Sequence, residues 1–364
     1  MPEKNRVLVA MSGGVDSSVA ALLLQEQGFE LVGVTMKVWD YEGSGEVAVE
    51  TSCCNLDSVH DARALAVKSG FPHYVIDLRE TFNDHVIQNF ISEYLSGMTP
   101  NPCVLCNSFI KWRALLEWAD KLGCSHIATG HYAVVGNERG RYFVSKGKDD
   151  VKEQSYVLWG LSQENLSRTM LPLGAMSKDK IRQIARDSGF DRIAGKRESY
   201  EICFIPDNDY RKFLKFRAPE ATAAIGKGEF RLADEQVVGQ HEGYPYYTIG
   251  QRKGLNIALG EPYYVTATDP ANNRVYLGKK EELSKSLLWI RNVNFQKYAE
   301  ISPGMEVITK IRYKDPGTRS RLYPEGEEIR IEFENAAGAI APGQSAVCYE
   351  GNDIVAGGII ERSE

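Results

Sequence analysis

The chain contains no hydrophobic run long enough to span a membrane. Hydrophobic residues make up 43% of its 364 residues, but the longest uninterrupted apolar stretches are short, such as VAALLL at 19–24. A membrane-spanning helix needs about 20 such residues in succession. The opening residues, MPEKNRVLVA, also hold an apolar segment too short for a secretory signal peptide. We therefore expect a cytoplasmic protein that makes no contact with a membrane.

Cysteines are few and odd in number. Seven cysteines in 364 residues do not indicate a disulfide framework, least of all in a reducing compartment. They are expected to be reactive, metal-bound or simply buried. Cys124 and Cys348 stand in apolar contexts and are predicted to be core residues. The adjacent pair Cys53 and Cys54 lies in a polar loop, where we expect a structural or incidental role.

The chain also lacks positive net charge. A formal net charge of −6 argues mildly against a dedicated nucleic-acid-binding protein. Basic residues nevertheless gather locally: KIRYKDPGTRSR, residues 310–321, has five of them against one acidic residue, and YRKFLKFR, residues 210–217, has four. QRKG, residues 251–254, adds two more at a turn. Each run alone is typical of a solvated face, but basic residues interleaved with aromatic ones also suit RNA.

The distribution of patterns predicts three domains. Up to about residue 200, strand-like runs such as RVLVA, LVGVTMKVW and SHIATGHY alternate with amphipathic helices, which is typical of a doubly wound parallel sheet. Beyond that point, short β-rich runs and Gly/Pro turns dominate and favour small β domains, the last of them a barrel. The predicted boundaries are residues 1–205 for the α/β domain, 206–280 for a small central domain and 281–364 for a C-terminal β-barrel.

A glycine pair joins the first strand to the first helix. In SGGVDSS, residues 12–18, the glycines would let the backbone approach a phosphate closely, and the helix N-terminus favours an anion. Asp16 would cap the helix or help to hold Mg²⁺. The lysine of the common phosphate loop is missing, and G-x-G-x-x-G is not matched. An ordinary tight turn remains the alternative, although the full string is much more specific than a glycine pair.

The string SGGVDSS resembles the PP-loop of the ATP pyrophosphatase superfamily. Enzymes of that superfamily cleave ATP between the α- and β-phosphates and adenylate an oxygen of the acceptor. The resemblance extends to MK on the next strand and to TGHY after a later one, and both fall at strand ends, where open α/β sheets bind ligands. It implies an ATP site made of Ala10, Met11, Ser12, Gly13, Gly14, Val15, Asp16, Ser17, Met36 and Gly130.

Two further cysteine segments select one branch of the superfamily. Cys103 and Cys106 form a C-x-x-C in GMTPNPCVLCNSFIKW, and the helical pattern predicts Cys106 near a helix N-terminus, where the helix dipole favours a thiolate. Cys203 lies in EICFI, a strand-like apolar run, and is by default a small buried residue. A zinc half-site or a redox pair are the alternatives for C-x-x-C, but the second C-x-x-C of a Cys₄ zinc site is absent.

Taken together, PNPxxxCN, GHY, KxQSY and EICFI are similar to motifs of the tRNA-specific 2-thiouridylase family. TIGQRKGL, IRY and APGQSAV extend the similarity over essentially the whole chain. The resemblance implies that ATP and Mg²⁺ activate O2 of the wobble uridine of tRNA (U34), which becomes 2-thiouridine. It also implies that Cys203 carries a persulfide received from a sulfur carrier or a cysteine desulfurase relay. Cys106 then releases the sulfur, and a disulfide between the two cysteines is the by-product.

The resemblance also implies residues that contact the tRNA anticodon, with the target base flipped out of its stack. These residues are Asn101, Pro102, Cys103, His131, Lys152, Glu153, Gln154, Arg312, Tyr313 and Gln344. His131 has an alternative as a hydrogen-bonded histidine at a strand end.

The chain departs from the family at Cys103, where better-known members carry Asp. Cys103, Cys106 and Cys203 together suggest a [4Fe–4S] cluster with one open iron. Its rival is a cluster-free persulfide site in which Cys103 is a spare or substitute thiol. Two other functional classes remain open: a PP-loop synthetase acting on a small molecule, and a non-catalytic RNA-binding or iron–sulfur protein with a degenerate loop.

Overall fold

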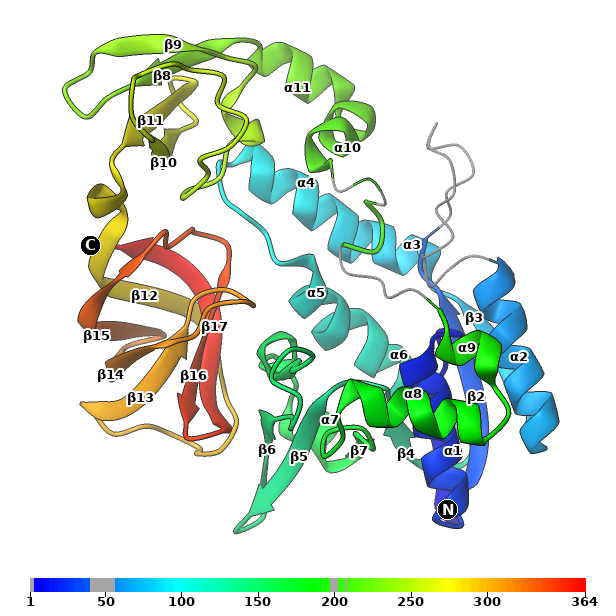
Figure 1. Cartoon of the computed structure of the whole chain (residues 1–364). Helices are drawn as coiled ribbons and strands as arrows, with labels where there is room; N and C mark the ends of the chain where they lie inside the picture. Colours follow the sequence, from blue (N-terminus) through cyan, green and yellow to red (C-terminus); the bar gives the residue numbers. More distant parts are fainter. Residues whose placement is uncertain (1–2, 40–55, 197–201, 206, 208) are drawn as a thin grey trace. The chain divides into compact units, whose positions relative to one another are not determined.

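The computed structural model describes residues 3–39, 56–196, 202–205, 207 and 209–364 (Figure 1). The chain divides into two compact units. Unit 1 comprises Met1–Val86, Cys103–Asn208 and Asn352–Ile354, and unit 2 comprises Ile87–Pro102, Asp209–Gly351 and Val355–Glu364. Cys53 and Cys54 lie outside the described residues, so the prediction made for them is not tested. No helix in the described ranges is long and apolar enough to cross a membrane.

Unit 1 is built on a five-stranded parallel sheet with the order β3-β2-β1-β4-β7. The strands are β1 (Glu3–Ala10), β2 (Glu30–Lys37), β3 (His73–Asp77), β4 (Cys124–Ala128) and β7 (Thr169–Met170). β1 is apolar throughout its second half, as expected for a central strand covered on both faces. The predicted doubly wound parallel sheet is thus confirmed.

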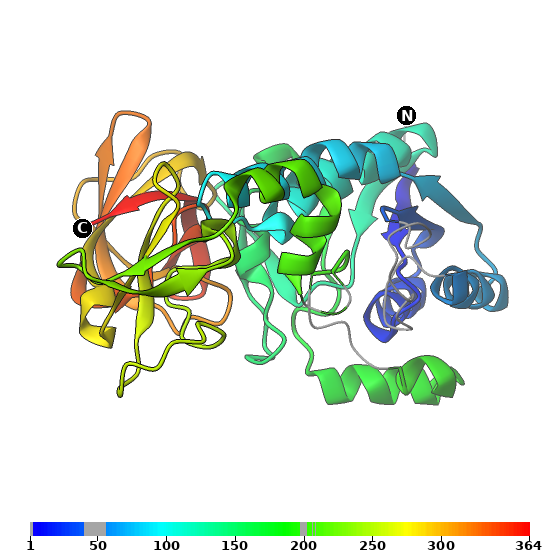
Figure 2. The same cartoon turned by 90° about the horizontal axis from the view of Figure 1, so that it is seen from above.

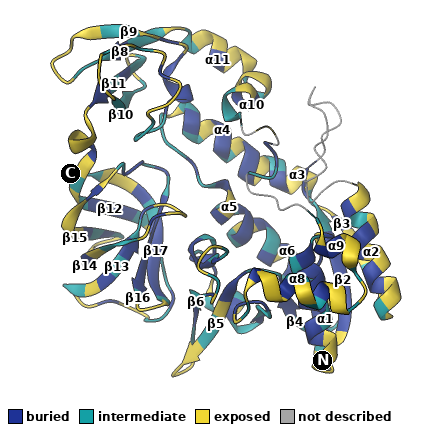
Figure 3. Ribbon diagram, viewed as in Figure 1, coloured by how far each residue is buried: buried dark blue, intermediate teal, exposed yellow. Residues whose placement is uncertain are grey.

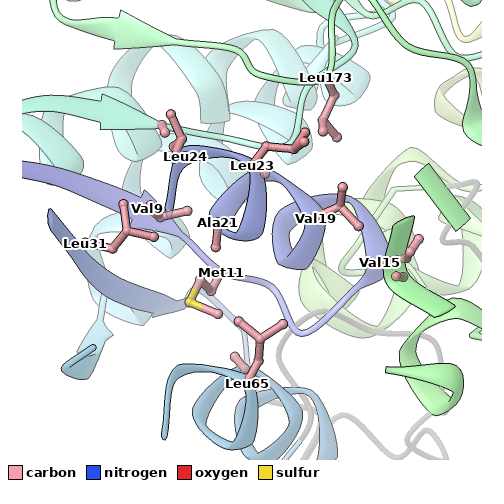
Figure 4. Close-up of a cluster of buried hydrophobic side chains, with 14 of the residues drawn as sticks. Val9, Met11, Val15, Val19, Ala21, Leu23, Leu24, Leu31, Leu65 and Leu173 are labelled. Carbon is pink, nitrogen blue, oxygen red and sulfur yellow. The ribbon is translucent and has the colours of Figure 1, made fainter. Parts of the chain in front are cut away.

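Helices cover both faces of this sheet. They include α1 (Val15–Glu26), α2 (Leu56–Ser69), α6 (Trp112–Lys121), α8 (Lys178–Asp187) and α9 (Asp191–Ala194). Successive strands on one side of β1 place α1 and α2 on the same face, and the return to β4 places α6 on the other, because crossovers are right-handed (Figure 2). Figure 4 shows Leu23, Leu24 and Val19 of α1 packed with Leu65 of α2 and Val9 of β1 in one buried cluster.

Two long helical segments interrupt the α/β alternation. The first comprises α3 (Arg79–Phe82), a π-helical segment η1 (Asn83–Ile87) and α4 (Gln88–Leu95). The second comprises α5 (Pro102–Leu105), a π-helical segment η2 (Cys106–Lys111) and then α6. Single π-turns inside helices recur at functional sites, and η2 contains one of the candidate cysteines. α4 belongs to unit 2. A hairpin of β5 (Ala133–Glu138) and β6 (Arg141–Lys146), the short helix η3 (Ser155–Leu158) and α7 (Gln163–Ser167) complete unit 1.

Unit 2 contains a small four-stranded sheet with the order β10-β11-β8-β9. Its elements are α10 (Tyr210–Arg217), α11 (Pro219–Ile225), β8 (Gly228–Arg231), β9 (Val237–His241), η4 (Tyr244–Tyr246), β10 (Tyr264–Asp269) and β11 (Arg274–Gly278). Aromatic rings join α4 to α10: Tyr94 stacks on Tyr210 with centroids 4.5 Å apart, and Phe90 meets Phe213 edge-on at 5.9 Å. This sheet is the small central β-rich region that the sequence predicted.

The rest of unit 2 is a closed barrel. The short helix η5 (Lys280–Leu283) leads into β12 (Ser284–Phe295), β13 (Met305–Lys310), β14 (Thr318–Glu325), β15 (Glu328–Gly338), β16 (Ser345–Glu350) and β17 (Asp353–Ser363). The strands follow the order β12-β15-β14-β13-β16-β17, and pairing of β12 with β17 closes the ring. Buried and exposed residues alternate along β15 (Figure 3), as in a barrel whose interior is filled by side chains. The predicted barrel is confirmed, and Cys348 lies in its core.

Candidate active site

The glycine-containing loop lies at the carboxyl edge of the parallel sheet. It runs from the end of β1 to Val15, the first residue of α1 (Figure 4). Gly13 adopts φ +70°, and a Cβ at this position would come within 2.0 Å of the backbone oxygen of Ser58. Only glycine therefore fits the turn. Gly14 is the N-cap of α1, and no side chain caps the helix, so the loop presents helix N–H groups as an anion site requires.

Side chains of the loop are ordered by hydrogen bonds. The Ser17 hydroxyl accepts from the Ser12 N–H (3.1 Å) and donates to the Gly14 carbonyl (3.2 Å). The two hydroxyls of Ser12 and Ser17 are 3.3 Å apart. Ser17 is buried and Ser12 is exposed, so a phosphate on the solvent side of the loop would meet the Ser12 hydroxyl.

The Asp16 carboxylate is shared by two groups from distant parts of unit 1. Lys178 Nζ donates to both of its oxygens at 2.8 Å, and the Tyr132 hydroxyl donates to Oδ1 at 2.5 Å. Lys178 is the first residue of α8 and is buried, whereas the Asp16 side chain keeps 34% of its surface exposed. Asp16 therefore keeps a solvent-exposed surface although both of its oxygens accept hydrogen bonds.

A second lysine holds the loop from another side. Lys196 Nζ donates to the Gly13 carbonyl at 2.9 Å and lies 2.5 Å from Oδ2 of Asp61, a buried residue of α2. Arg192 approaches Oδ1 of the same carboxylate at 3.5 Å. The loop is thus braced by two lysines that follow it by more than 160 positions in the chain.

Met36 and Gly130 lie on the same sheet edge as the loop. Met36 is the penultimate residue of β2, and Gly130 follows the end of β4. A Cβ on Gly130 would lie 2.8 Å from the Asp16 carbonyl carbon and from the Ser17 nitrogen. Gly130 therefore allows the end of β4 to approach the loop closely, as the predicted nucleotide site requires.

Cys106 lies one turn inside the helix that contains it. The helix containing it begins at Pro102, where proline is favoured because its missing N–H would be unpaired in any case. Cys106 therefore opens the second turn, the π-helical segment η2, and is buried, while Cys103 occupies the first turn and is exposed. Cys106 thus lies near a helix N-terminus, as predicted, but one turn further in, because the periodicity from Asn107 onward missed the proline-initiated turn before it.

Cys103 differs from an ordinary surface thiol. It is exposed, but desolvation by the protein raises the pKa of its thiol, against a smaller opposing effect of Lys111. The thiol therefore stays protonated at neutral pH.

Cys203 lies in a turn, which the strand-like pattern of EICFI did not predict. The Ile205 N–H donates to the Ile202 carbonyl at 2.9 Å and closes this turn. Cys203 is half-buried, and the next residue, Phe204, is buried against Phe82 of α3 (ring centroids 5.7 Å apart). Because α3 also contacts η2, the segments containing Cys203 and Cys106 pack against the same helical turn.

The phosphate loop and the two cysteine segments lie at the same edge of the sheet. α3 begins two residues after the end of β3, and the carboxyl ends of parallel strands share one edge of a sheet. The phosphate loop, Met36, Gly130 and the helical turn that contacts both cysteine segments therefore belong to one region of unit 1.

His131 occupies a desolvated position beside this edge. Its Nδ1 is 2.8 Å from the Thr129 hydroxyl, and its ring lies 5.5 Å from that of Trp112, whose Nε1–H donates to the Thr169 hydroxyl at 2.8 Å. Burial, assisted by the charge of Lys111, lowers the pKa of His131 to about 3. His131 is thus a neutral hydrogen-bonding group at physiological pH.

The pKa of His131 leads to a measurable pH dependence. The folded protein binds the imidazole proton only near pH 3, whereas the unfolded chain binds it below about 6.5. His131 therefore contributes stability above pH 6.5 that is lost as the pH falls toward 3. We expect the His131 ring resonances, assigned by comparison with His131→Gln, to stay constant from pH 8 to pH 5 in an NMR titration. A midpoint near 6.5 would contradict this environment.

Three sequence families match consecutive parts of the chain. They are described as the tRNA methyl transferase HUP domain (residues 5–207), the tRNA methyl transferase PRC-barrel domain (211–279) and the aminomethyltransferase beta-barrel domain (285–360). The tRNA-specific 2-thiouridylase MnmA of Amoebophilus asiaticus is 57% identical over 362 residues, which are 99% of this chain and 96% of that protein. The chain belongs to the tRNA-specific 2-thiouridylase family.

Other relatives match with similar coverage. The proteins of the same name from Cytophaga hutchinsonii and Salinibacter ruber are 55% and 52% identical, covering all of this chain and 99% and 96% of theirs. Among solved structures, a complex of a 4-thiouridine synthetase with RNA and bound ATP has a TM-score of 0.37 at 15% identity, over 60% of this chain and 52% of that one. A likeness at that level supports no further conclusion. The family predicted from the motifs is confirmed, while the domain boundaries at 205 and 280 stay predictions.

Some of the unit 1 residues that the family resemblance assigns to tRNA contact form hydrogen bonds within the protein. The Gln154 side chain accepts from the Tyr132 N–H at 3.0 Å, and the Gln154 N–H donates to the Tyr132 carbonyl at 2.9 Å. Glu153 is buried, and its carboxylate accepts from the Ser155 N–H. Lys152 is half-buried. Glu153 and Gln154 therefore shape this turn beside the phosphate loop.

The remaining tRNA candidates lie on unit 2 or at its edge. Gln344 donates its side-chain N–H to the carbonyls of Thr99 (3.1 Å) and Pro100 (2.9 Å), and so fixes the segment that leads to Asn101 and Pro102. Arg312 and Tyr313 are exposed in the loop between β13 and β14. Asp315 is buried there, and its carboxylate accepts from the N–H groups of Ile311 (2.9 Å) and Gly317 (3.1 Å), so a rigid loop presents the two exposed side chains.

Sequence reasoning missed Lys178, Lys196 and the acidic partner Asp61. Lys178 did leave a signal, because it shares one face of α8 with the buried residues Ile181 and Ala185, at helical spacing. A lysine at an apolar position of a helix is rarely buried without a partner. No sequence pattern indicates Lys196 or Asp61, since the contact between them depends on how α2 and α9 pack.

Proposed function

We propose that the protein is an ATP-dependent tRNA-uridine 2-sulfurtransferase that converts the wobble uridine, U34, to 2-thiouridine. The observation that carries the proposal is that an ATP-type phosphate loop and two cysteine segments meet at one sheet edge, in a chain whose relatives are named tRNA-specific 2-thiouridylases over their whole length. The glycine turn, the uncapped helix N-terminus and the close approach of Gly130 all suit the binding of a nucleoside triphosphate.

In the first half-reaction, uridine O2 attacks the α-phosphorus of ATP, and pyrophosphate leaves. The chain contributes positioning and charge rather than covalent chemistry to this step. The amides of the loop and the Ser12 hydroxyl face the phosphates, and Asp16 is the carboxylate best placed to hold Mg²⁺ with them. Ala10, Met11, Val15 and Ser17 shape the loop, and Met36 borders the nucleotide.

In the second half-reaction, a persulfide on Cys203 delivers sulfur. Its terminal sulfur attacks uridine C2, and AMP leaves with the original O2. The Cys106 thiolate then attacks the Cys203 sulfur, breaking its bond to the transferred atom. The products are 2-thiouridine, AMP and a Cys106–Cys203 disulfide, which an external thiol must reduce before a new persulfide arrives from a sulfur carrier or desulfurase. A half-buried Cys203 in a turn and a buried Cys106 packed on the same helical turn support these two roles.

Cys103 takes no part in sulfur transfer in this scheme. Its raised thiol pKa keeps it protonated, which suits a hydrogen-bond donor beside the target base better than a nucleophile. Asn101, Pro102 and the neutral His131 would border the same base.

A [4Fe–4S] cluster on Cys103, Cys106 and Cys203 does not fit the structure. All three residues are described, and the described part of the chain holds no group of three or more His, Cys, Asp or Glu side chains arranged to bind a metal. No step of the proposed reaction is therefore assigned to a cluster. Iron and acid-labile sulfide in stoichiometric amounts in anaerobically purified protein would overturn this conclusion.

The test of the proposed function is the reaction itself. Unmodified tRNA is incubated anaerobically with the protein, Mg-ATP and a persulfide donor, and its nucleosides are analysed by mass spectrometry. A uridine with one oxygen replaced by sulfur, found at the wobble position, supports the proposal. ATP cleaved to AMP with no thionucleoside formed would favour a synthetase acting on a small molecule.

Exposed basic residues of the barrel loop should make tRNA binding depend on salt. Each lysine or arginine that neutralises a phosphate releases counterions, so binding weakens as salt increases. We expect Arg312→Gln to weaken tRNA binding and to reduce the slope of log K against log[salt] by about 1. Lys121→Gln is the matched control, because exposed Lys121 ends α6 at the opposite edge of the sheet, just before β4. An unchanged slope for Arg312→Gln, in filter-binding assays, would exclude this loop from the interface.

A further inference from the structure

The phosphate loop contains no lysine, but two lysines that lie much later in the chain, Lys178 and Lys196, contact it. Lys178 Nζ donates to both Asp16 oxygens at 2.8 Å, and Lys196 Nζ donates to the Gly13 carbonyl at 2.9 Å. They contact the loop at different residues and come from different segments, Lys178 from the start of α8 and Lys196 from just after α9.

Lys196 determines which way the Gly13–Gly14 peptide faces. In a trans peptide, the carbonyl of one residue and the N–H of the next point in opposite directions. Because Lys196 holds the Gly13 carbonyl, the Gly14 N–H points to the other side of the loop. A glycine adopts φ +70° about as readily as negative φ values. A contact from outside the loop, such as that of Lys196, therefore keeps this N–H in one orientation.

The position of Lys196 is itself fixed by a buried acid. Asp61 of α2 is 7% exposed, and its Oδ2 lies 2.5 Å from Lys196 Nζ. The ion pair positions the ammonium group under the Gly13 carbonyl and balances its charge. The loop, α2 and the segment after α9 are thereby joined at one point.

Lys178 brings positive charge to the first turn of α1. Its side chain is 11% exposed, it is bound by both Asp16 oxygens, and its ammonium group lies 5.6 Å from the centroid of the Tyr132 ring. Buried ion pairs contribute little to stability compared with apolar residues of similar volume. A buried lysine kept beside a phosphate loop, with a partly exposed carboxylate as its partner, is better explained by a ligand that carries negative charge.

We propose that Lys178 and Lys196 together replace the lysine that this loop lacks. Lys196 is a positioning residue that orients the Gly14 N–H toward the nucleotide phosphates, and Lys178 supplies positive charge to them while Asp16 turns to a cation. This inference rests on the proposed use of ATP and assigns two residues to the triphosphate part of that site.

The test is equilibrium binding of ATP and of adenosine to the full-length chain in the presence of Mg²⁺. Lys178→Met and Lys196→Met should each weaken ATP binding about 10- to 100-fold, the usual effect of losing a hydrogen bond to a charged group, and leave adenosine binding unchanged. Lys180→Met is the matched control, because Lys180 is exposed on the same helix as Lys178, and its ATP affinity should equal that of the wild type. Lys178→Arg should recover part of the loss.

Other outcomes separate the possible failures. If the wild type binds neither ligand, the proposed use of ATP fails. If it binds ATP and both Met variants bind ATP equally well, or lose ATP and adenosine affinity in parallel, the assignment of the lysines fails. Should Lys178→Met not fold, Lys178→Gln removes the charge but keeps a polar side chain beside Asp16. A purely structural role predicts normal ATP affinity for this variant, and the proposal predicts weak binding.

Discussion

Replacing Cys203 by serine is expected to abolish 2-thiouridine formation and to leave the first half-reaction, in which ATP releases pyrophosphate, intact. A hydroxyl cannot carry the persulfide, so the loss should reach the detection limit of the assay. The phosphate loop should still support activation of uridine O2, because the groups that order it, the Ser17 hydroxyl and the Lys196 ammonium, are unchanged. The measurement pairs mass spectrometry of tRNA nucleosides with quantification of pyrophosphate in one reaction.

Controls for this experiment come from the other cysteines. Cys124→Ala changes a buried thiol of β4 whose pKa is raised to about 11 by burial, and thiolation should continue. Cys106→Ser should leave the tRNA joined to Cys203 through the transferred sulfur and release no 2-thiouridine, since nothing breaks the bond between that sulfur and Cys203. Full thiolation by Cys203→Ser would remove the persulfide mechanism, whereas loss of both thiolation and pyrophosphate release would show that the substitution disrupts the nucleotide site.

Gly13→Ala is expected to eliminate ATP binding. A Cβ at Gly13 would lie 2.0 Å from the backbone oxygen of Ser58 in α2, and because the obstacle is backbone, the loop itself must move. The Gly13 carbonyl would then leave Lys196, and the Gly14 N–H would lose its orientation. We expect ATP affinity, measured by calorimetry, to fall at least 100-fold, which corresponds to about 2.7 kcal/mol.

Gly28→Ala is the matched control for this loop. Gly28 has φ +84°, but no atom lies within 4 Å of the Cβ that it would gain. Both substitutions therefore place alanine in the left-handed region, at roughly 1–2 kcal/mol each, and only Gly13→Ala adds a clash. Normal ATP affinity for Gly28→Ala with loss for Gly13→Ala locates the effect at the loop. Equal ATP affinity in both variants would mean that the loop does not hold phosphate.

The motifs were readable from the sequence because each depends on local geometry. A strand, a glycine turn and a helix N-terminus follow one another within SGGVDSS, so the phosphate loop required no tertiary information. The parallel sheet and the barrel were also predictable, since strand–helix alternation and short β runs with turns determine which faces must be buried. The family resemblance then supplied roles for Cys106 and Cys203 that their spacing alone left open.

The sequence failed where packing decides local structure. The pattern from Asn107 onward placed a helix start near Cys106, but Pro102 begins the helix earlier and leaves Cys106 in its second turn. EICFI had the composition of a strand, yet Phe204 is buried against α3 and the chain turns at Cys203. In both cases a nearby partner or a capping residue outweighed the apolar periodicity.

By itself, the sequence determined the type of loop, the class of each domain and the family. Only the tertiary structure decided which charges surround the loop. Lys178, Lys196 and Asp61 are distant from SGGVDSS in the chain, and they meet it because α2, α8 and the turn after α9 pack around α1. Charge pairing between such segments has no periodicity, so it becomes visible only once the helices are placed.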